Sequence, residues 1–494
     1  MNDTTAVATP DFQVAIIGTG FAGLGMAIRL KKDGIDSFVV FEKADEVGGT
    51  WRENTYPGAA CDVPSHMYSF SFEPNPRWTR TFAPQPEILD YLKRTADKYG
   101  VRPHIRFRAE ITDIVFDEAG DRWTVTTADG QAVTARVVVL GIGPLHVPAI
   151  PQLKGMETFQ GQVMHSATWD HEYDLTGKRV AVIGTGASAI QIVPSIAGQV
   201  EKLHLFQRTA PWVLPKIDRP FTGLEKVAFR RLPLLQRLSR NRIYWQQEAR
   251  ILGMAVDPRI MKAAEWVAKG FIRSQISDPE LRKAVTPDYT MGCKRILLSN
   301  TYYAALDRDN VEVVTDGIAE IRPHSVVTRD GSEYEVDVIV LGTGFKVGDL
   351  GNLNVTGRGG IELREAWAGG MEAYLGLAVA GFPNLFYLVG PNTGLGHNSI
   401  VFMAEAQADY ILQALRLLEK ENAGRIEVWP EAQQAFNERI QSQLSEAVWS
   451  AGGCMSWYLD ADGKNRTLWP GFTFTYWLAT RRLNTDDYQL PAAA

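Results

Sequence analysis

The chain has 494 residues, of which 45% are hydrophobic and 22% charged, a composition typical of folded globular proteins rather than disordered ones. Asp and Glu (57) outnumber Lys and Arg (51), so the net charge of −6 argues against a dedicated nucleic-acid-binding protein, which needs a basic surface. Three cysteines, Cys61, Cys293 and Cys454, are too few and too scattered for a disulfide framework or a metal cluster, and we expect no metal site.

Residues 1–12 lack the charged and apolar regions of a signal peptide. No stretch of the chain reaches the roughly 20 uninterrupted apolar residues of a membrane span. We therefore expect a cytoplasmic protein without a transmembrane segment.

Short apolar, β-branched runs recur along the chain and predict buried strands. They are Val14–Ile17, Phe38–Phe41, Val137–Leu140, Val180–Ile183, Leu203–Phe206, Val336–Leu341 and Leu385–Val389. Continuous apolar strands separated by helical segments are typical of parallel sheets that are covered on both faces. The chain is thus predicted to be an α/β protein with two Rossmann-like dinucleotide-binding domains. Between Ile111 and Leu140 an alternating pattern predicts an antiparallel hairpin inserted after the first βαβ unit.

The first glycine motif, Gly18-Thr19-Gly20-Phe21-Ala22-Gly23, follows the first predicted strand and opens a predicted helix. Gly18 permits the tight turn, Gly20 lets a pyrophosphate approach the backbone, and Gly23 lets the helix pack closely on the strand. Glu42 ends the next strand about 20 residues on, where an acidic side chain accepts hydrogen bonds from ribose hydroxyls. We expect FAD at this site.

The second motif, Gly184-Thr185-Gly186-Ala187-Ser188-Ala189, follows another predicted strand. The strand after it ends in Gln207-Arg208-Thr209 instead of an acid. An acid would repel a 2′-phosphate, whereas arginine and a neighbouring hydroxyl would bind it, so we expect NADPH here. The alternative is that Arg208 is an ordinary surface arginine.

From Phe221 to Lys283 the pattern is helical and rich in arginine, which predicts a helical insertion. A basic amphipathic helix can also lie on a membrane, although solvated helix faces commonly have this pattern. The predicted domains are an FAD-binding domain (1–148 and 343–494, the latter including a C-terminal covering segment), an NADP-binding domain (149–215 and 287–342) and a helical insertion (216–286).

The segment between the two motifs, Phe159-Gln-Gly161-Gln-Val-Met-His165-Ser-Ala-Thr-Trp169-Asp170, matches FxGxxxHxxxW[P/D] position for position. It resembles the fingerprint of type I Baeyer–Villiger monooxygenases. Gly48–Trp51 and Tyr56–Asp62 are similar to that family's flavin-contacting segment, with Ala60 where the family usually has arginine. Gly292–Arg295 is similar to its G-T-K-R segment, with Cys293 in place of threonine. Gly390–Ile400 resembles the family's late loop near the flavin, and Cys454–Trp477 resembles the tail of a subgroup.

The resemblance implies that NADPH reduces FAD, that reduced flavin and O2 form a C4a-peroxyflavin, and that a ketone becomes an ester or lactone. A fixed cation beside the flavin would stabilise the anionic peroxide. The family resemblance makes Arg295, held by Asp62, the candidate for this role; without it, Lys294 and Arg295 look like an ordinary surface pair. The alternatives are a flavin-dependent N- or S-oxygenase and a non-oxygenating NADPH:flavin reductase. The expected partners are a ketone and O2, and a homo-oligomer is compatible with the sequence.

The catalytic candidates are Arg295 and Asp62. The predicted cofactor-binding residues are Gly18, Gly20, Phe21, Ala22, Gly23, Glu42, Thr50, Trp51, Asp62, Tyr68, Ile111, Gly184, Thr185, Gly186, Ala187, Ser188, Ala189, Arg208, Thr209, Lys294 and Arg295. The resemblance places His165 on a linker between domains, in structural coupling. We expect Trp457 and Trp469 to serve packing, and neither is included among the catalytic candidates.

Overall fold

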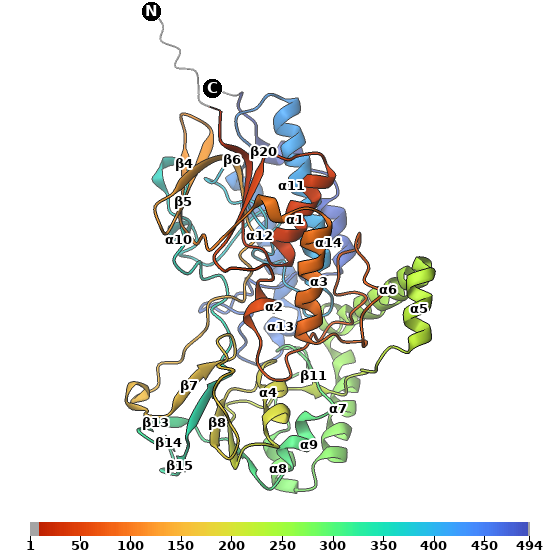
Figure 1. Ribbon diagram of the computed structural model, residues 1–494, viewed down its shortest axis with the longest axis vertical. Helices are drawn as coiled ribbons and strands as arrows, with labels where there is room; N and C mark the ends of the chain where they lie inside the picture. The colour runs from red at the N-terminus through yellow and green to blue at the C-terminus, as the bar shows by residue number, and fades with distance from the viewer. Residues whose placement is uncertain (1–8, 493–494) are drawn as a thin grey trace, which may run out of the picture.

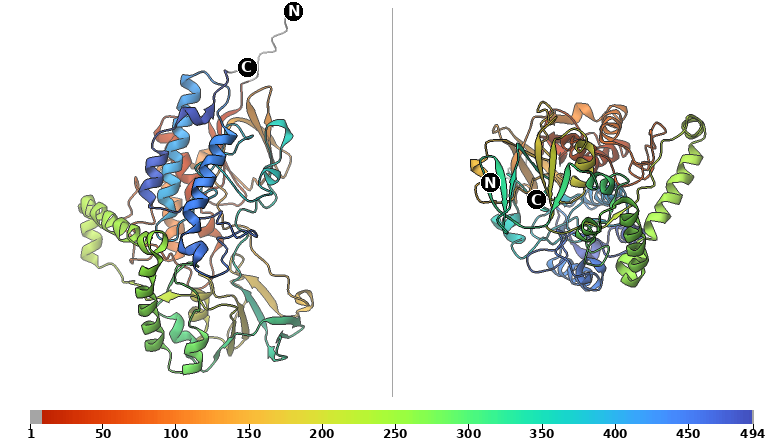
Figure 2. Two further views of the ribbon diagram at one scale, coloured as in Figure 1. Left: turned by 180° about the vertical axis from the view of Figure 1, so that it is seen from behind. Right: turned by 90° about the horizontal axis from the view of Figure 1, so that it is seen from below.

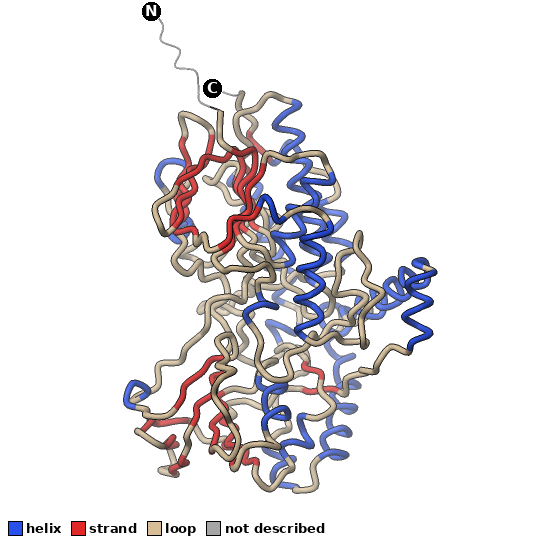
Figure 3. The backbone as a smooth tube through the Cα atoms, in the orientation of Figure 1, coloured by secondary structure: helices blue, strands red, loops and turns tan. Residues whose placement is uncertain are grey.

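The computed structural model describes residues 9–492 and is built on two β-sheets that lie toward opposite ends of its long axis (Figures 1 and 3). Residues 1–8, which hold most of the segment inspected for a signal peptide, lie outside this range. No helix among the described residues is long and apolar enough to cross a membrane.

The first sheet has eight strands in the order β17-β4-β5-β6-β1-β2-β3, with β18 also paired to β6. Strands β6, β1, β2 and β3 are parallel, whereas β4 and β5 form the expected antiparallel hairpin and β5 returns antiparallel to β6. The strands are β1 (Phe12–Ile17), β2 (Phe38–Glu42), β3 (Ile105–Phe107), β4 (Ile111–Asp117), β5 (Arg122–Thr127), β6 (Ala132–Leu140), β17 (Asn354–Thr356) and β18 (Leu385–Tyr387).

Strand β1 shows how this sheet is buried on both faces. Val14 and Ile16 belong to the core shared with the helices, and Ala15 and Ile17 to the core shared with β4 and β5. This alternation follows the two-residue period of a strand. The elements around the sheet are α1 (Phe21–Lys32), α2 (Thr50–Glu53), α3 (Gln85–Lys98), α10 (Leu363–Ala366), α11 (Ile400–Lys420), β19 (Glu427–Val428), α12 (Pro430–Ser445), α13 (Val448–Ala451), α14 (Thr473–Thr480) and β20 (Tyr488–Gln489).

The second sheet has five parallel strands in the order β12-β9-β8-β16-β7. Helices cover one face, and a three-stranded antiparallel sheet covers the other. The strands are β7 (Gln162–His165), β8 (Arg179–Ile183), β9 (Lys202–Phe206), β12 (Val311–Val314) and β16 (Val338–Leu341); the covering elements are α4 (Ala189–Ile196), α9 (Tyr302–Leu306), β13 (Ile318–Arg322), β14 (Ser325–Thr328) and β15 (Glu333–Glu335).

The helical insertion leaves the second domain at β10 (Val213–Leu214) and returns at β11 (Leu297–Leu298), which pairs with β10 in parallel. Between them lie α5 (Gly223–Arg231), α6 (Pro233–Glu248), a π-helical turn (Leu252–Val256), α7 (Met261–Gln275) and α8 (Pro279–Ala284). Helices α5 and α6 form a hairpin that projects from the body of the protein (Figures 1 and 2).

The predicted α/β architecture with two parallel sheets and a helical insertion is confirmed, and two strands are shorter than predicted. Strand β16 begins at Val338, and the carboxylate of the preceding Asp337 accepts hydrogen bonds from Arg179. Strand β18 ends at Tyr387, and Val389 has a positive φ of 58° that breaks the extended backbone. The exact domain boundaries stay a prediction.

Candidate functional site

The first glycine motif forms a cradle that side chains would fill. Gly18 has a φ of +98°, and a Cβ there would lie 2.7 Å from the carbonyl oxygen of Gly141. A Cβ on Gly23 would lie 2.0 Å from the Gly18 carbonyl oxygen. At Gly20 the nearest atom to such a Cβ is the Gly49 Cα at 3.7 Å, so the backbone here is accessible to a ligand. The backbone N–H groups at the start of α1 suit a pyrophosphate.

Glu42 ends β2 beside this motif and is buried. Its Oε2 accepts hydrogen bonds from the Thr19 amide (3.1 Å) and hydroxyl (2.5 Å), and its Oε1 pairs with Arg52 Nη1 at 3.0 Å. Arg52 therefore compensates the buried charge. Arg52 was not among the predicted site residues, although it directly follows the predicted contact residues Thr50 and Trp51 in the sequence.

An aromatic cluster adjoins the same motif. Trp51 Nε1 donates to the Tyr68 hydroxyl at 3.0 Å, and the rings of Phe21 and Tyr68 lie 5.0 Å apart. Burial raises the pKa of Tyr68 well above its ordinary value, so its hydroxyl stays neutral. Ile111 stands apart from this cluster, because it is buried in the core between the sheet and the hairpin.

The second glycine motif repeats this geometry. Gly184 has a φ of +109°, and a Cβ there would lie 2.5 Å from the Gly342 carbonyl oxygen. Around Gly186 a Cβ would meet open space, and the buried Ala189 begins α4. The Thr185 hydroxyl donates to the Thr209 carbonyl at 2.9 Å, which ties the motif to the end of the next strand.

Arg208 and Lys294 come from distant parts of the sequence, and Arg208 lies close enough to affect the pKa of Lys294. Burial and the Arg208 guanidinium together lower the pKa of Lys294. Two cations this close repel one another, and an anion between them would relieve that repulsion. Arg208 is exposed, so the geometry also permits the surface position considered as an alternative.

The segment before Asp62 docks on α4 of the second domain. Gln191 on α4 accepts a hydrogen bond from the Ala60 amide (2.8 Å) and donates to the Tyr56 hydroxyl (3.3 Å). A Cβ on Gly58 would lie 2.3 Å from Ser195 Oγ, so only glycine fits there. The segment Tyr56–Asp62 therefore joins the two dinucleotide folds, which explains its glycine and small residues.

Asp62 and Arg295, 233 residues apart in the sequence, form an ion pair. Asp62 Oδ2 lies 2.6 Å from Arg295 Nη2 and accepts from Arg295 Nε at 2.8 Å. Burial alone would raise the pKa of Asp62, but the charge and hydrogen bonds of Arg295 lower it. Asp62 in turn raises the pKa of Arg295. About 30% of each side chain is exposed, so the pair is partly accessible to solvent.

Two further cations adjoin this pair. Lys216 Nζ donates to the Cys61 carbonyl at 3.1 Å, and Lys216 helps to lower the pKa of Asp62. Arg250, beside the π-helical turn, is also within electrostatic reach of Asp62 and Arg295. Asp62 is thus surrounded by three cations, which makes this region electropositive. The sequence carries no motif that would have identified Lys216 or Arg250.

The late loop and the C-terminal segment converge on Arg295. Arg295 Nη1 donates to the Leu395 carbonyl at 3.4 Å. The loop is hydrogen-bonded to the tail through the Gly394 amide and the Thr467 carbonyl (2.8 Å). Tyr458 of the tail is buried within electrostatic reach of Arg295.

A disulfide bond joins Cys293 to Cys454 and fixes the tail to the segment that carries Arg295. The sequence argued against a disulfide framework, and this single bond was not foreseen because 161 residues separate the two cysteines. The third cysteine, Cys61, is free and buried.

The fingerprint histidine does not lie on a linker as expected. His165 is the last residue of β7, an edge strand of the second sheet, and is buried. Its Nδ1 accepts from the Ala167 amide at 3.1 Å, so Nε2 carries the proton and donates to the Gly344 carbonyl at 3.0 Å. The interpretation as a structural residue fits this geometry. Trp469 is also buried, whereas Trp457 is half-exposed.

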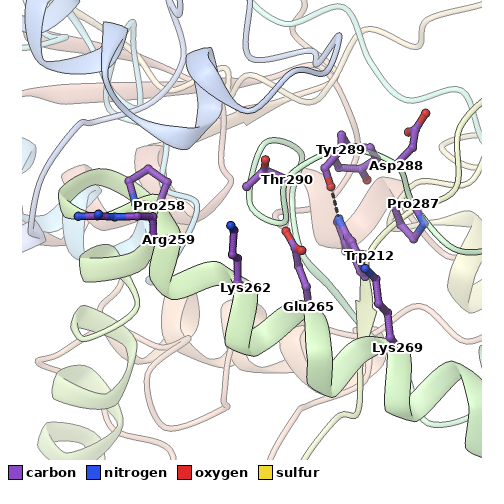
Figure 4. Close-up of a pocket in the computed structure, with 10 residues that line it drawn as sticks. All are labelled: Trp212, Pro258, Arg259, Lys262, Glu265, Lys269, Pro287, Asp288, Tyr289 and Thr290. Atoms are coloured by element: carbon purple, nitrogen blue, oxygen red, sulfur yellow. Dashed lines mark hydrogen bonds between the residues drawn. The ribbon is translucent and has the colours of Figure 1, made fainter.

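A pocket of about 410 Å³ opens between α7 and the segment Pro287–Thr290 (Figure 4). Arg259, Lys262 and Lys269 line it, and the Trp212 indole donates to the Tyr289 carbonyl at 2.9 Å. The ammonium group of Lys294 lies 5.1 Å from the centre of the Tyr289 ring, so this basic pocket adjoins the Lys294 segment.

Comparison with known proteins assigns a family to this architecture. The sequence matches the model of the flavin-binding monooxygenase-like family over residues 11–252. A Baeyer-Villiger monooxygenase of Pseudomonas aeruginosa is 52% identical over 488 residues, which cover 98% of this chain and 93% of that protein. An oxidized steroid monooxygenase bound to NADP has a TM-score of 0.87 and 34% identity, over 97% of this chain and 99% of that one. OTEMO in complex with FAD and NADP has a TM-score of 0.89 and 27% identity, over 98% and 100%.

Proposed function

The chain belongs to the Baeyer–Villiger monooxygenases, and we propose that it uses NADPH, FAD and O2 to insert one oxygen atom next to a ketone carbonyl, giving an ester or lactone. The ion pair of Arg295 and Asp62, beside the segment that joins the two dinucleotide folds, is the observation that carries this proposal. FAD, when bound, would supply the hydride acceptor and the site of oxygen activation.

The first motif and Glu42 would hold FAD, because the open backbone at Gly20 suits a pyrophosphate and the carboxylate suits ribose hydroxyls. The cluster of Phe21, Trp51 and Tyr68 would pack against the same cofactor. These aromatic side chains exclude water and fix the position of the bound group.

The second motif would hold NADPH, with Arg208, Thr209 and Lys294 around its 2′-phosphate. The support is electrostatic: the mutual repulsion of Arg208 and Lys294 falls when a dianion lies between them. An acid at the end of β9 would reverse this preference.

Arg295 would stabilise the negative charge that develops on oxygen during the insertion. The Arg295 guanidinium does not lose a proton at neutral pH, so it stays positively charged. Asp62 fixes it in place before the reaction. Lys216 and Arg250 add to the positive potential, and Asp62 partly compensates the charge of the three cations.

The test is a product analysis with the purified FAD-loaded protein, NADPH and a panel of cyclic and linear ketones. We expect an ester or lactone, identified by gas chromatography, in proportion to the NADPH consumed. Products from amines or sulfides without any ester would support an N- or S-oxygenase instead. NADPH consumption that yields only hydrogen peroxide would support a reductase. The cytoplasmic location stays a prediction that cell fractionation tests.

A further inference from the structure

In the projecting hairpin of α5 and α6, helix α6 turns several polar side chains toward the protein. From α6, Gln236 donates to the Asn75 carbonyl at 2.7 Å, and Arg240 donates to the carbonyls of His66 (2.8 Å) and Ser69 (2.9 Å). At the end of the helix the buried Glu248 accepts from Thr473 Oγ1 at 2.7 Å. Ile243 and Tyr244 of the same helix also pack against the core, so the inward face is mixed, whereas a covering helix normally turns a mainly apolar face inward.

The outward face of α6 is apolar. Leu234, Leu238 and Trp245 are 66%, 55% and 60% exposed. At about 100° per residue their side chains fall within a sector of about 40°, so they form one stripe along the helix. Leu224 on α5 (84% exposed) and Leu232 between the helices extend this surface. Isolated exposed leucines are common, but a continuous apolar surface marks an interaction site.

Arginines border the apolar stripe on both sides. By the same helical geometry Arg237 and Arg242 lie about 80° and about 60° to either side of the centre of the stripe, and both are exposed. Residues 223–248 contain six Lys or Arg, of which only Arg240 is bonded inward as described above, and two Glu, in a protein with a net charge of −6. Both acids are engaged, Glu225 with Arg219 and Glu248 with Thr473. The hairpin is therefore a basic island on an acidic protein.

The surface continues onto the C-terminal helix. Trp245 lies 6.2 Å, ring to ring, from Phe474 on α14. On that helix Trp477 and Leu478 are exposed and the exposed Arg481 lies over the Trp477 ring. The same combination of apolar and basic side chains thus occurs on two elements that are far apart in the sequence but adjacent here.

We propose that the α5–α6 hairpin, with the exposed side of α14, binds to the surface of an anionic lipid bilayer. Leucine and tryptophan side chains would enter the interfacial region, and the flanking arginines would contact anionic headgroups. The charge of the hairpin favours this partner, because a second copy of the chain would bring an identical basic surface against it and be repelled.

The experiment is flotation of the full-length FAD-loaded protein with vesicles. Vesicles of equal parts phosphatidylcholine and phosphatidylglycerol are compared with phosphatidylcholine alone. We expect binding to the anionic vesicles, reduced about tenfold or more in the double variant Leu234→Asp and Leu238→Asp and in Arg237→Glu with Arg242→Glu. The matched control is Val115→Asp with Ile361→Asp, which changes exposed apolar side chains elsewhere and should bind normally.

No flotation of the wild-type protein, or equal flotation with both kinds of vesicle, would overturn the proposal. Light scattering of the same variants tests whether a second copy of the chain binds to the hairpin instead. If Leu234→Asp with Leu238→Asp converts a dimer to a monomer, the hairpin is an interface between copies and the proposal is wrong. Because binding is measured without substrate, the result is independent of the oxygenation reaction.

Discussion

Replacing Arg295 with alanine is the sharpest test of the candidate site. The variant removes the guanidinium held by Asp62 and by the Leu395 carbonyl, and leaves both glycine motifs unchanged. A unit charge about 4 Å from a developing negative charge contributes about 4 kcal/mol at the effective dielectric constant of a protein surface. About 30% of the Arg295 side chain is exposed, so we reduce this to about 3 kcal/mol for screening.

A loss of about 3 kcal/mol corresponds to a fall of about 100-fold in ester formation, within the range observed when one preorganised group is removed. The assay measures ester formed per NADPH oxidised, together with FAD binding and the rate of flavin reduction. We expect the ester ratio to fall and the other two quantities to stay near those of the wild type. Arg295→Lys keeps the charge but has one nitrogen in place of the three that contact Asp62 and Leu395, so it should recover part of the activity.

An unchanged ester ratio in Arg295→Ala would refute the reasoning. Loss of FAD binding in this variant would show instead that Arg295 has a structural role. Asp62→Asn distinguishes positioning from charge, because the amide can still accept a hydrogen bond from Arg295 Nε. We expect it to lower the ester ratio less than Arg295→Ala does.

Three further predictions concern other parts of the protein. Arg208→Ala should raise the KM for NADPH about 10-fold or more and leave the KM for NADH nearly unchanged in steady-state assays; equal effects would exclude a phosphate contact. Burial lowers the pKa of His66 to about 4, so the folded state binds fewer protons than the unfolded state between about pH 6.5 and 4. Melting curves should show that the stability of the folded state decreases as the pH is lowered across that window. The decrease should be less steep in His66→Phe. Cys293→Ser should lower the melting temperature, because the bond to Cys454 closes a loop whose entropy is worth at most about 5 kcal/mol. An unchanged melting temperature would show that this bond does not stabilise the tail.

Local geometry explains why the dinucleotide folds were predictable. The spacing of Gly18, Gly20 and Gly23 reflects contacts within a few residues of one turn, such as the approach of Gly23 to the Gly18 carbonyl oxygen. The alternating burial of β1 likewise follows from the period of a strand. The pairing of Asp62 with Arg295 was inferred from the family resemblance, since no local pattern connects residues so far apart.

The sequence by itself determined the two glycine-motif folds and the helical insertion, because these depend on short-range periodicity and turn chemistry; the assignment of FAD to the first motif and NADPH to the second stays a prediction. Only the tertiary structure decided which distant side chains meet: Lys216 and Arg250 around Asp62, Arg52 on Glu42, and Cys293 with Cys454. It also decided that α6 turns Gln236 and Arg240 inward and leaves Leu234, Leu238 and Trp245 exposed. These contacts depend on how domains and insertions pack, and long-range packing leaves no periodic signal in the chain.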